Sequence, residues 1–181
     1  MKNRFFRRIL VLAAATVLAV NPISAFAVTT VTRTADNDAV ASSGNSNYNY
    51  GFVYTTASSH YNGDARISGS AYSGNIYEWI YPHPKSGAAF VKGDNVSIKV
   101  EAYLNHSTFK DPAAVYYVNT WQYTATFVKT LDQNKAAAGW NVLGTISQNR
   151  DGWLSEYVHM NPSGTVGLNT GADAIRVTYT W

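Results

Sequence analysis

The sequence predicts an all-β protein: an antiparallel β-sandwich with jelly-roll-like connections and a flexible N-terminal lead-in. Beyond residue 54 the chain consists of short segments in which apolar and polar residues alternate, separated by turns rich in glycine, proline, asparagine and aspartate. A helical period occurs only at residues 133–138, which are too few to form a substantial helix. Many short strands at close spacing are typical of two-layer β folds.

Residues 1–27 have the pattern of a secretory signal peptide, with a basic start, an apolar run and a small-residue cleavage site. The apolar run at 9–20 is shorter than the roughly 20 residues that a membrane-spanning helix needs. Ala25-Phe26-Ala27 follows it closely. We therefore expect cleavage before Val28 and secretion from a bacterial cell. The mature protein is expected to be extracellular, with cell-wall association left open, and not to be stably inserted in a membrane.

The charge balance changes once residues 1–27 are removed. The ten remaining basic residues are then matched by eleven acidic ones, and the lysines are scattered. A basic surface is required for binding nucleic acid or anionic membranes, so neither is expected as a partner. The sequence has no cysteine, so the 154 residues left of 181 must form one domain stabilised by its core alone.

The segment 28–53 is rich in serine, threonine and asparagine and is predicted to be a flexible lead-in. Within it, Val28–Thr32 has the composition of one edge strand. The sandwich domain is expected to span residues 54–181.

The first half of this domain contains four predicted strands. Ile76–Tyr81 alternates and is stopped by Pro82. Val96–Leu104 follows a Gly-Asp-Asn turn, and its even-numbered residues are all apolar, which indicates a half-buried strand. Ala113–Val118 follows an Asp-Pro pair, and Trp121–Thr130 alternates aromatic and polar residues.

Four further strands are predicted in the second half. Trp140–Ile146 begins after the loop at 134–138, and a turn at 149–152 leads into Trp153–Met160. A Pro-Ser-Gly turn reverses the chain into Thr165–Asn169, and Ala174–Trp181 completes the domain.

Three segments near the C-terminus resemble the golvesin C-terminal-like domain, a module also found on xanthan lyases. The matching residues lie in Gly139–Gly144, in Val166-Gly167-Leu168 and in Ala172–Arg176. Weaker matches occur at Tyr61–Arg66 and Ala114–Val118, so that the resemblance covers about Tyr54 to Tyr179. The chain departs from the family at 102–104, where the family favours tryptophans. The resemblance implies a carbohydrate-binding or cell-surface module.

Polysaccharide binding is predicted from aromatic side chains, because a flat ring packs against the C–H face of a pyranose while nearby polar groups bind its hydroxyls. An alternation with period 2 does not say which face of a strand is buried, so the aromatic face of Ile76–Tyr81 is either ligand-facing or core. Tyr103 lies opposite an aliphatic row and is expected to be exposed. The candidate ligand-binding residues are Tyr77, Trp79, Tyr81, Tyr103, Trp153, Tyr157 and His159.

Other prominent residues are expected to be structural. The sequence indicates core positions for Trp121, Trp140 and Trp181. Asp173 and Arg176 are expected to form an ion pair or to cap a loop rather than to contact ligand.

Catalysis is not predicted. The four histidines are at least 23 residues apart, which fits no metal-binding spacing, and no serine lies in a Gly-x-Ser-x-Gly motif. Glu78, Glu101 and Glu156 are candidates for a glycosidase pair only by elimination. No cofactor is expected, although scattered aspartates leave a structural calcium ion open.

The sequence thus predicts a secreted, non-catalytic module that binds extracellular or cell-wall polysaccharide. The alternative is a structural or adhesive surface protein that acts by self-association. A small polysaccharide-active hydrolase and an outer-membrane barrel are less favoured; most strands are shorter than the roughly 9–11 residues that a membrane strand needs.

Overall fold

The computed structural model describes a protein built almost entirely of antiparallel strands. It covers residues 28–37, 45–48, 51–68, 75–80, 95–105, 107, 109–120, 124–149 and 157–181. The predicted signal peptide lies outside this part of the chain. The described residues include one short 3-10 turn, η1 (Tyr61–Gly63), and none of their helical segments is long and apolar enough to cross a membrane.

The strands form three sheets. Sheet A contains, in spatial order, β1 (Thr30–Ala35), β12 (Ile175–Thr180), β6 (Asn95–Leu104) and β9 (Gly139–Asn149). Sheet B contains β2 (Asn45–Tyr48), β5 (Tyr77–Ile80), β10 (Tyr157–Asn161), β7 (Ala114–Thr120) and β8 (Thr124–Leu131). Sheet C contains β11 (Thr170–Ala172), β4 (Asp64–Ser68) and β3 (Phe52–Thr56).

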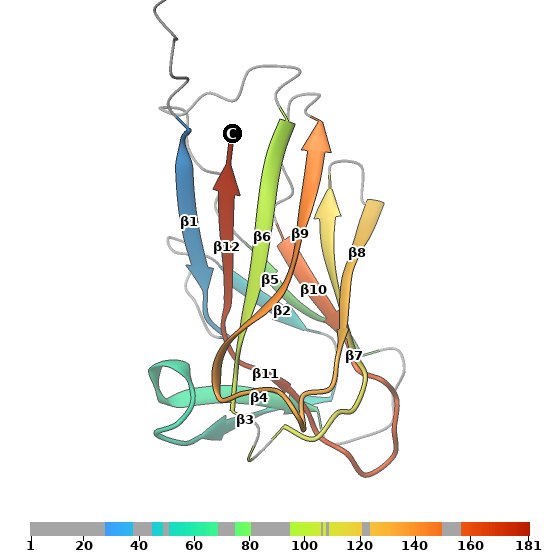
Figure 1. The fold of residues 1–181 in the computed structure, drawn as a ribbon. Coiled ribbons are helices and arrows are strands. Elements are labelled where there is room, and N and C mark those ends of the chain that lie inside the picture. Colours follow the sequence, from blue (N-terminus) through green and yellow to red (C-terminus); the bar gives the residue numbers. More distant parts are fainter. Residues whose placement is uncertain are drawn as a thin grey trace, which may run out of the picture.

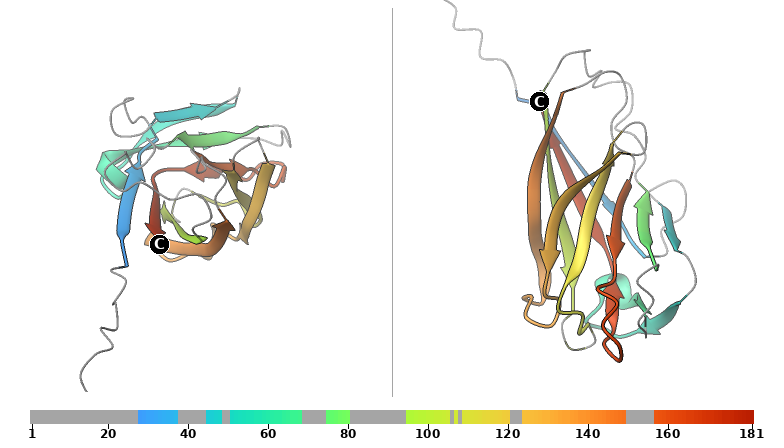
Figure 2. Two further views of the ribbon diagram at one scale, coloured as in Figure 1. Left: turned by 90° about the horizontal axis from the view of Figure 1, so that it is seen from above. Right: turned by 90° about the vertical axis from the view of Figure 1, so that its right-hand side faces the viewer.

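Sheets A and B are the two layers of the predicted sandwich, and sheet C crosses one end of it (Figures 1 and 2). One continuous core joins all three sheets, with Val100 and Val177 from sheet A, Trp79 and Val158 from sheet B and Phe52 from sheet C. Burial of apolar area in this core supplies the main stabilisation, since the sequence has no cysteine.

Strand β6 confirms the predicted half-buried strand at Val96–Leu104. Its even-numbered residues from Val96 to Leu104 are buried, and Ser97, Lys99 and Tyr103 lie on the opposite, outer face. The strand is central in sheet A, between β12 and β9, so that a half-buried alternating pattern is what its position requires.

The aromatic face of β5 points into the core, so the described aromatic residues of this strand do not form a ligand-binding surface. Tyr77 and Trp79 are 0% and 1% exposed. The Tyr77 hydroxyl donates to the Asn37 carbonyl at 2.6 Å, and the Trp79 indole N–H donates to the Asp173 carbonyl at 2.9 Å. Both are therefore core residues with satisfied polar atoms. Tyr81 lies outside the described residues.

Some expected elements are placed differently. The lead-in contributes β1, which is the predicted edge strand and pairs with β12, and also β2, which was not predicted and pairs with β5. Sheet C contains two strands that the sequence did not indicate, β3 and β4. The strand expected at 165–169 is a turn, with Gly167 at a φ of 78°, and the strand β11 begins only at Thr170.

Candidate functional site

Three aromatic rings meet on the outer face of sheet A, at the end that adjoins sheet C. Tyr103 of β6 and Trp140 of β9 are register partners, and Tyr61 comes from η1. The ring centroids of each pair lie 5.4–5.5 Å apart with edge-to-face geometry. All three side chains are half-buried. We call these three residues the Tyr103 cluster.

Charged groups border this cluster on the same face. The Arg176 guanidinium lies 4.3 Å from the centroid of the Trp140 ring, and its Nε donates to Glu101 Oε2 at 2.9 Å. Lys99 Nζ lies 3.0 Å from Glu101 Oε1. The hydrogen bond from Arg176 holds the pKa of Glu101 below its ordinary value. Arg176 thus makes the expected ion pair, whereas Trp140, expected in the core, lies on the outer face.

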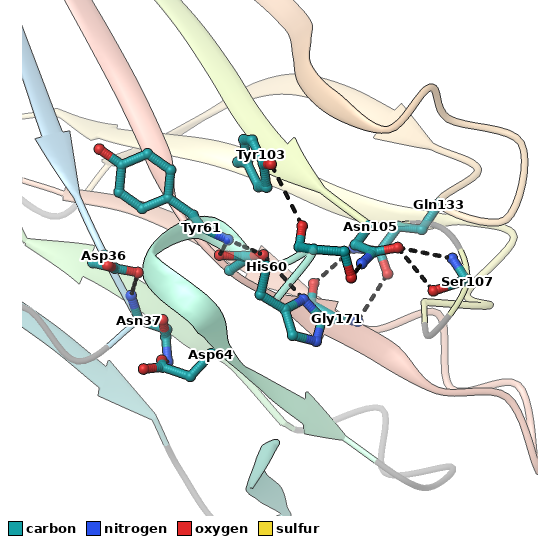
Figure 3. A network of polar contacts seen from close by, with 12 residues as sticks. Asp36, Asn37, His60, Tyr61, Asp64, Tyr103, Asn105, Ser107, Gln133 and Gly171 are labelled. Atoms are coloured by element: carbon teal, nitrogen blue, oxygen red, sulfur yellow. Dashed lines mark hydrogen bonds and ion pairs between the residues drawn. The ribbon is translucent and has the colours of Figure 1, made fainter. Parts of the chain in front are cut away.

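The loop before η1 fixes Tyr61 in this cluster. The Tyr61 backbone N–H donates to both carboxyl oxygens of Asp173 at 3.2 Å, so Asp173 caps the loop as expected. Figure 3 shows His60, Tyr61 and Tyr103 around this loop. The Tyr103 hydroxyl donates to the Ser59 carbonyl at 3.4 Å, and the Asn105 amide donates to the Ser59 hydroxyl. Two of the three rings are therefore tied to one loop by polar contacts.

A buried histidine–aspartate contact lies beneath this loop. His60 Nδ1 is 3.3 Å from Asp173 Oδ2, and neither side chain is exposed. Burial raises the pKa of Asp173 to about 8, with a further rise from the Asp36 and Asp64 carboxylates. Burial lowers the pKa of His60. At neutral pH the contact therefore joins two uncharged side chains.

The two nearby aspartates are held by amide groups. Asn62 Nδ2 donates to Asp36 Oδ2 and Asn37 Nδ2 donates to Asp64 Oδ1, both at 2.6 Å. Asn62 has a φ of 52°, a left-handed conformation that asparagine tolerates better than most residues. Within the described part of the chain, no group of three or more histidine, cysteine or acidic residues is arranged to hold a metal ion.

A second set of rings crosses the outer face of sheet B. The His159 and Tyr117 rings are stacked with centroids 4.8 Å apart, and Phe127 meets Tyr117 edge to face at 6.0 Å. These residues come from the neighbouring strands β10, β7 and β8. We call His159, Tyr117 and Phe127 the His159 row. Tyr157 lies on the same face, two residues before His159.

The structure therefore separates the predicted ligand-binding residues. Tyr103 lies on the outer face of sheet A, and Tyr157 and His159 lie on that of sheet B, while Trp153 is outside the described residues. Tyr61, Tyr117 and Phe127 were not singled out from the sequence. Tyr61 belongs to the weaker match at 61–66, which was the one signal for it.

No family model matches the chain, and no curated protein matches it. Among solved structures, a xanthan lyase from Paenibacillus is 17% identical with a TM-score of 0.56, over 81% of this chain and 13% of that one. The module CBM32-1 of a family 31 glycoside hydrolase from Clostridium perfringens is 11% identical, with a TM-score of 0.41 over 74% of this chain and 92% of that one. A xylan-binding module, CBM15, is 13% identical, with a TM-score of 0.34 over 84% of this chain and 95% of that one.

The similarity to the xanthan lyase shows a shared fold. The chain spans only 13% of that enzyme's length, so the likeness concerns one region of a much larger protein. A sandwich of this kind hosts unrelated functions, which must be argued from the site itself.

Proposed function

We propose that this protein is an exported, non-catalytic module of the golvesin-like type that binds extracellular or cell-wall polysaccharide through the Tyr103 cluster. The observation that carries the proposal is the meeting of three half-exposed aromatic rings from three separate segments beside a charged pair. The cluster lies at the surface of a rigid sheet, where a ligand can reach it without opening the core.

The chemistry of the cluster suits a sugar. A pyranose presents C–H groups on one face, which pack against aromatic rings, and hydroxyl groups around its edge. Arg176 lies beside the rings and offers donors for those hydroxyls, and Glu101 holds it in place through its Nε. The contacts of Tyr61 and Tyr103 with the Ser59 and Asp173 region hold the rings in place before binding, which reduces the entropy lost on association.

The sequence resemblance supports the same location. Tyr61, Trp140 and Arg176 belong to three different segments that match the golvesin C-terminal-like domain, and in the fold they meet at this one cluster. Residues that lie 36 to 115 positions apart are thus joined in a single surface feature.

The arrangement of carboxyl groups favours binding over catalysis. Both oxygens of Glu101 are engaged, by Arg176 and by Lys99. Asp173 is buried beneath the loop that carries Tyr61. A glycosidase requires two carboxyl groups facing a shared cleft, and these two face different environments.

The proposal is tested by binding purified residues 28–181 to insoluble cellulose, chitin, peptidoglycan and xanthan beads, with calcium and with chelator. Tyr103→Ala and Trp140→Ala should each weaken retention at least tenfold, equivalent to about 1.4 kcal/mol. Tyr54→Ala removes an exposed tyrosine from sheet C and should leave retention unchanged. Thermal unfolding of each variant controls for folding.

Failure of the wild-type protein to bind any of these polymers, together with a mass that rises with concentration, would favour the structural protein that acts by self-association. Export is tested separately: the secreted protein should begin at Val28, as read by N-terminal sequencing of the culture medium.

A further inference from the structure

Three buried polar atoms on the outer face of sheet B have no hydrogen-bond partner: Asn119 Oδ1, His159 Nδ1 and Asn161 Oδ1. Asn119 and His159 are 7% and 9% exposed. Their strands, β7 and β10, are adjacent: Asn119 is the register partner of Tyr157, and Tyr117 is that of His159. The three atoms therefore lie on one surface.

Such a group of unpaired atoms is unusual. More than about 90% of buried polar groups in proteins are hydrogen-bonded, and each unpaired one costs about 1–3 kcal/mol. Other buried polar atoms without a partner, such as Gln148 Nε2, lie elsewhere in the described part of the chain, but these three gather on one sheet face. Some buried polar side chains of the described residues are fully paired. Gln133, which is fully buried, bonds to Tyr116 and to both backbone groups of Gly171. The three atoms of sheet B lack partners of the kind that Gln133 has, and they share one face.

The same surface carries the His159 row. Phe127 is 56% exposed, and the row runs across β10, β7 and β8 rather than along one strand. Neighbouring strands lie about 4.8 Å apart, so three strands give the row a length of roughly 10 Å. A ligand that follows the row must be extended and must present flat C–H faces to the rings.

The charges of sheet B indicate what kind of ligand fits. In the described strands of this sheet the charged residues are Glu78 and Lys129. Lys129 donates to the Val142 carbonyl of β9 and is thus directed toward sheet A. Glu78 is the register partner of His159, which burial keeps uncharged by lowering its pKa. The surface therefore offers no described cation for an anionic polymer, and its asparagine oxygens require hydrogen donors.

We propose that the outer face of sheet B is a second binding face, specific for an uncharged glycan chain that lies across β10, β7 and β8. Sugar hydroxyls donate to the Asn119 and Asn161 side-chain oxygens, and sugar rings pack on Phe127 and Tyr117. The side chains that cover these oxygens shift when the chain binds. This face is proposed to bind the same class of ligand as the Tyr103 cluster, but it is formed by different residues.

The two faces point in opposite directions, because the inner faces of sheets A and B enclose the same core. One molecule with both faces occupied joins two glycan chains. Linking chains in this way raises apparent affinity for a dense polymer well above that of either face alone.

The test is affinity electrophoresis of the full-length mature protein in native gels that contain either mixed-linkage β-glucan, a neutral polymer, or polygalacturonate, an anionic one. Phe127→Ala and Asn119→Ala should each weaken retardation by β-glucan at least about fivefold. Val53→Ala, which removes an exposed apolar side chain from sheet C, is the control and should leave the retardation unchanged. The wild-type protein should also raise the viscosity of a β-glucan solution, and Phe127→Ala should abolish that rise.

The two proposals fail separately. Folded Phe127→Ala and Asn119→Ala variants with unchanged retardation would overturn the second face, as would stronger retardation by polygalacturonate than by β-glucan. If these two variants lose their retardation while Tyr103→Ala is retarded as strongly as the wild type, the second face is confirmed and the Tyr103 cluster is excluded as a binding site. Thermal unfolding curves identify any variant that fails to fold, and Tyr117→Phe, which keeps the ring, should retain binding.

Discussion

Replacement of Asp173 by asparagine is expected to stabilise the protein at neutral pH, although Asp173 contacts a histidine. The reason lies in its protonation. Asp173 is buried, and its folded-state pKa is about 8, against an ordinary value of 3.8. At pH 7 the folded protein therefore holds a proton on Asp173 that the unfolded chain has lost. An asparagine resembles the protonated acid in shape and needs no proton.

The size of the effect follows from the pH and the unfolded-state pKa. Holding a proton on a group of pKa 3.8 at pH 7 costs about 4 kcal/mol, at about 1.4 kcal/mol per pH unit. The cost is absent below about pH 4, grows as the pH rises and is complete above about pH 8. Asp173 thus lowers the stability of the wild type with rising pH, and the asparagine variant should not show this part of the profile.

The measurement is urea unfolding of the wild type and Asp173→Asn at pH 4.5, 7 and 9. We expect the variant to be more stable by about 4 kcal/mol at pH 7, with a smaller difference at pH 4.5. Asp132→Asn, at a partly exposed aspartate paired with the exposed Lys135, should change stability little at these three pH values and serves as the control. A variant less stable than the wild type at pH 7, with a His60 pKa above 6.5 by NMR, would refute this reasoning, because it would show an ion pair.

Three further variants test the packing and the polar contacts. Gly171→Ala would place a methyl group against the Phe109 ring, so urea unfolding should show a loss of about 3 kcal/mol, and an unchanged midpoint would contradict that contact. Gln133→Leu leaves the backbone groups of Gly171 unpaired and should cost about 2–4 kcal/mol, whereas Gln133→Glu at low pH should recover part of it. Glu101→Gln leaves Arg176 without its anionic partner; we expect a loss of about 1 kcal/mol in unfolding and weaker polysaccharide retention, and equal retention would exclude Glu101 from the site.

The sequence could predict the sandwich because its long strands alternate clearly. Val96–Leu104 shows which residues of β6 face the core, since one side is aliphatic throughout. The alternation in Ile76–Tyr81 has apolar residues on both sides, so only the packing of Tyr77 and Trp79 against the sandwich decides the buried face. Strands β3 and β4 have only five residues each, too few for a clear alternation, and β4 forms between its two partners β3 and β11.

The candidate site was only partly predictable for a related reason. Tyr103 was recognisable because its strand has one aliphatic face. Its neighbours were not, because Tyr61 reaches it from a turn whose anchor, Asp173, lies 112 residues away in the sequence. The position of Trp140 on the outer face depends on the register between β9 and β6, which no single strand reveals.

The pairing of β1 with β12 has a mechanical consequence. Thr29 and Trp181 exchange two backbone hydrogen bonds, at 2.9 and 3.1 Å, and the antiparallel register continues from Thr30 and Thr180 to Ala35 and Ile175. A pulling force applied between residues 29 and 181 therefore opens these pairs one after another, as in unzipping, instead of loading them together. Sheet A yields from its outer edge under such a load, and the central strand β6 loses its neighbour β12 only after β1 has come away.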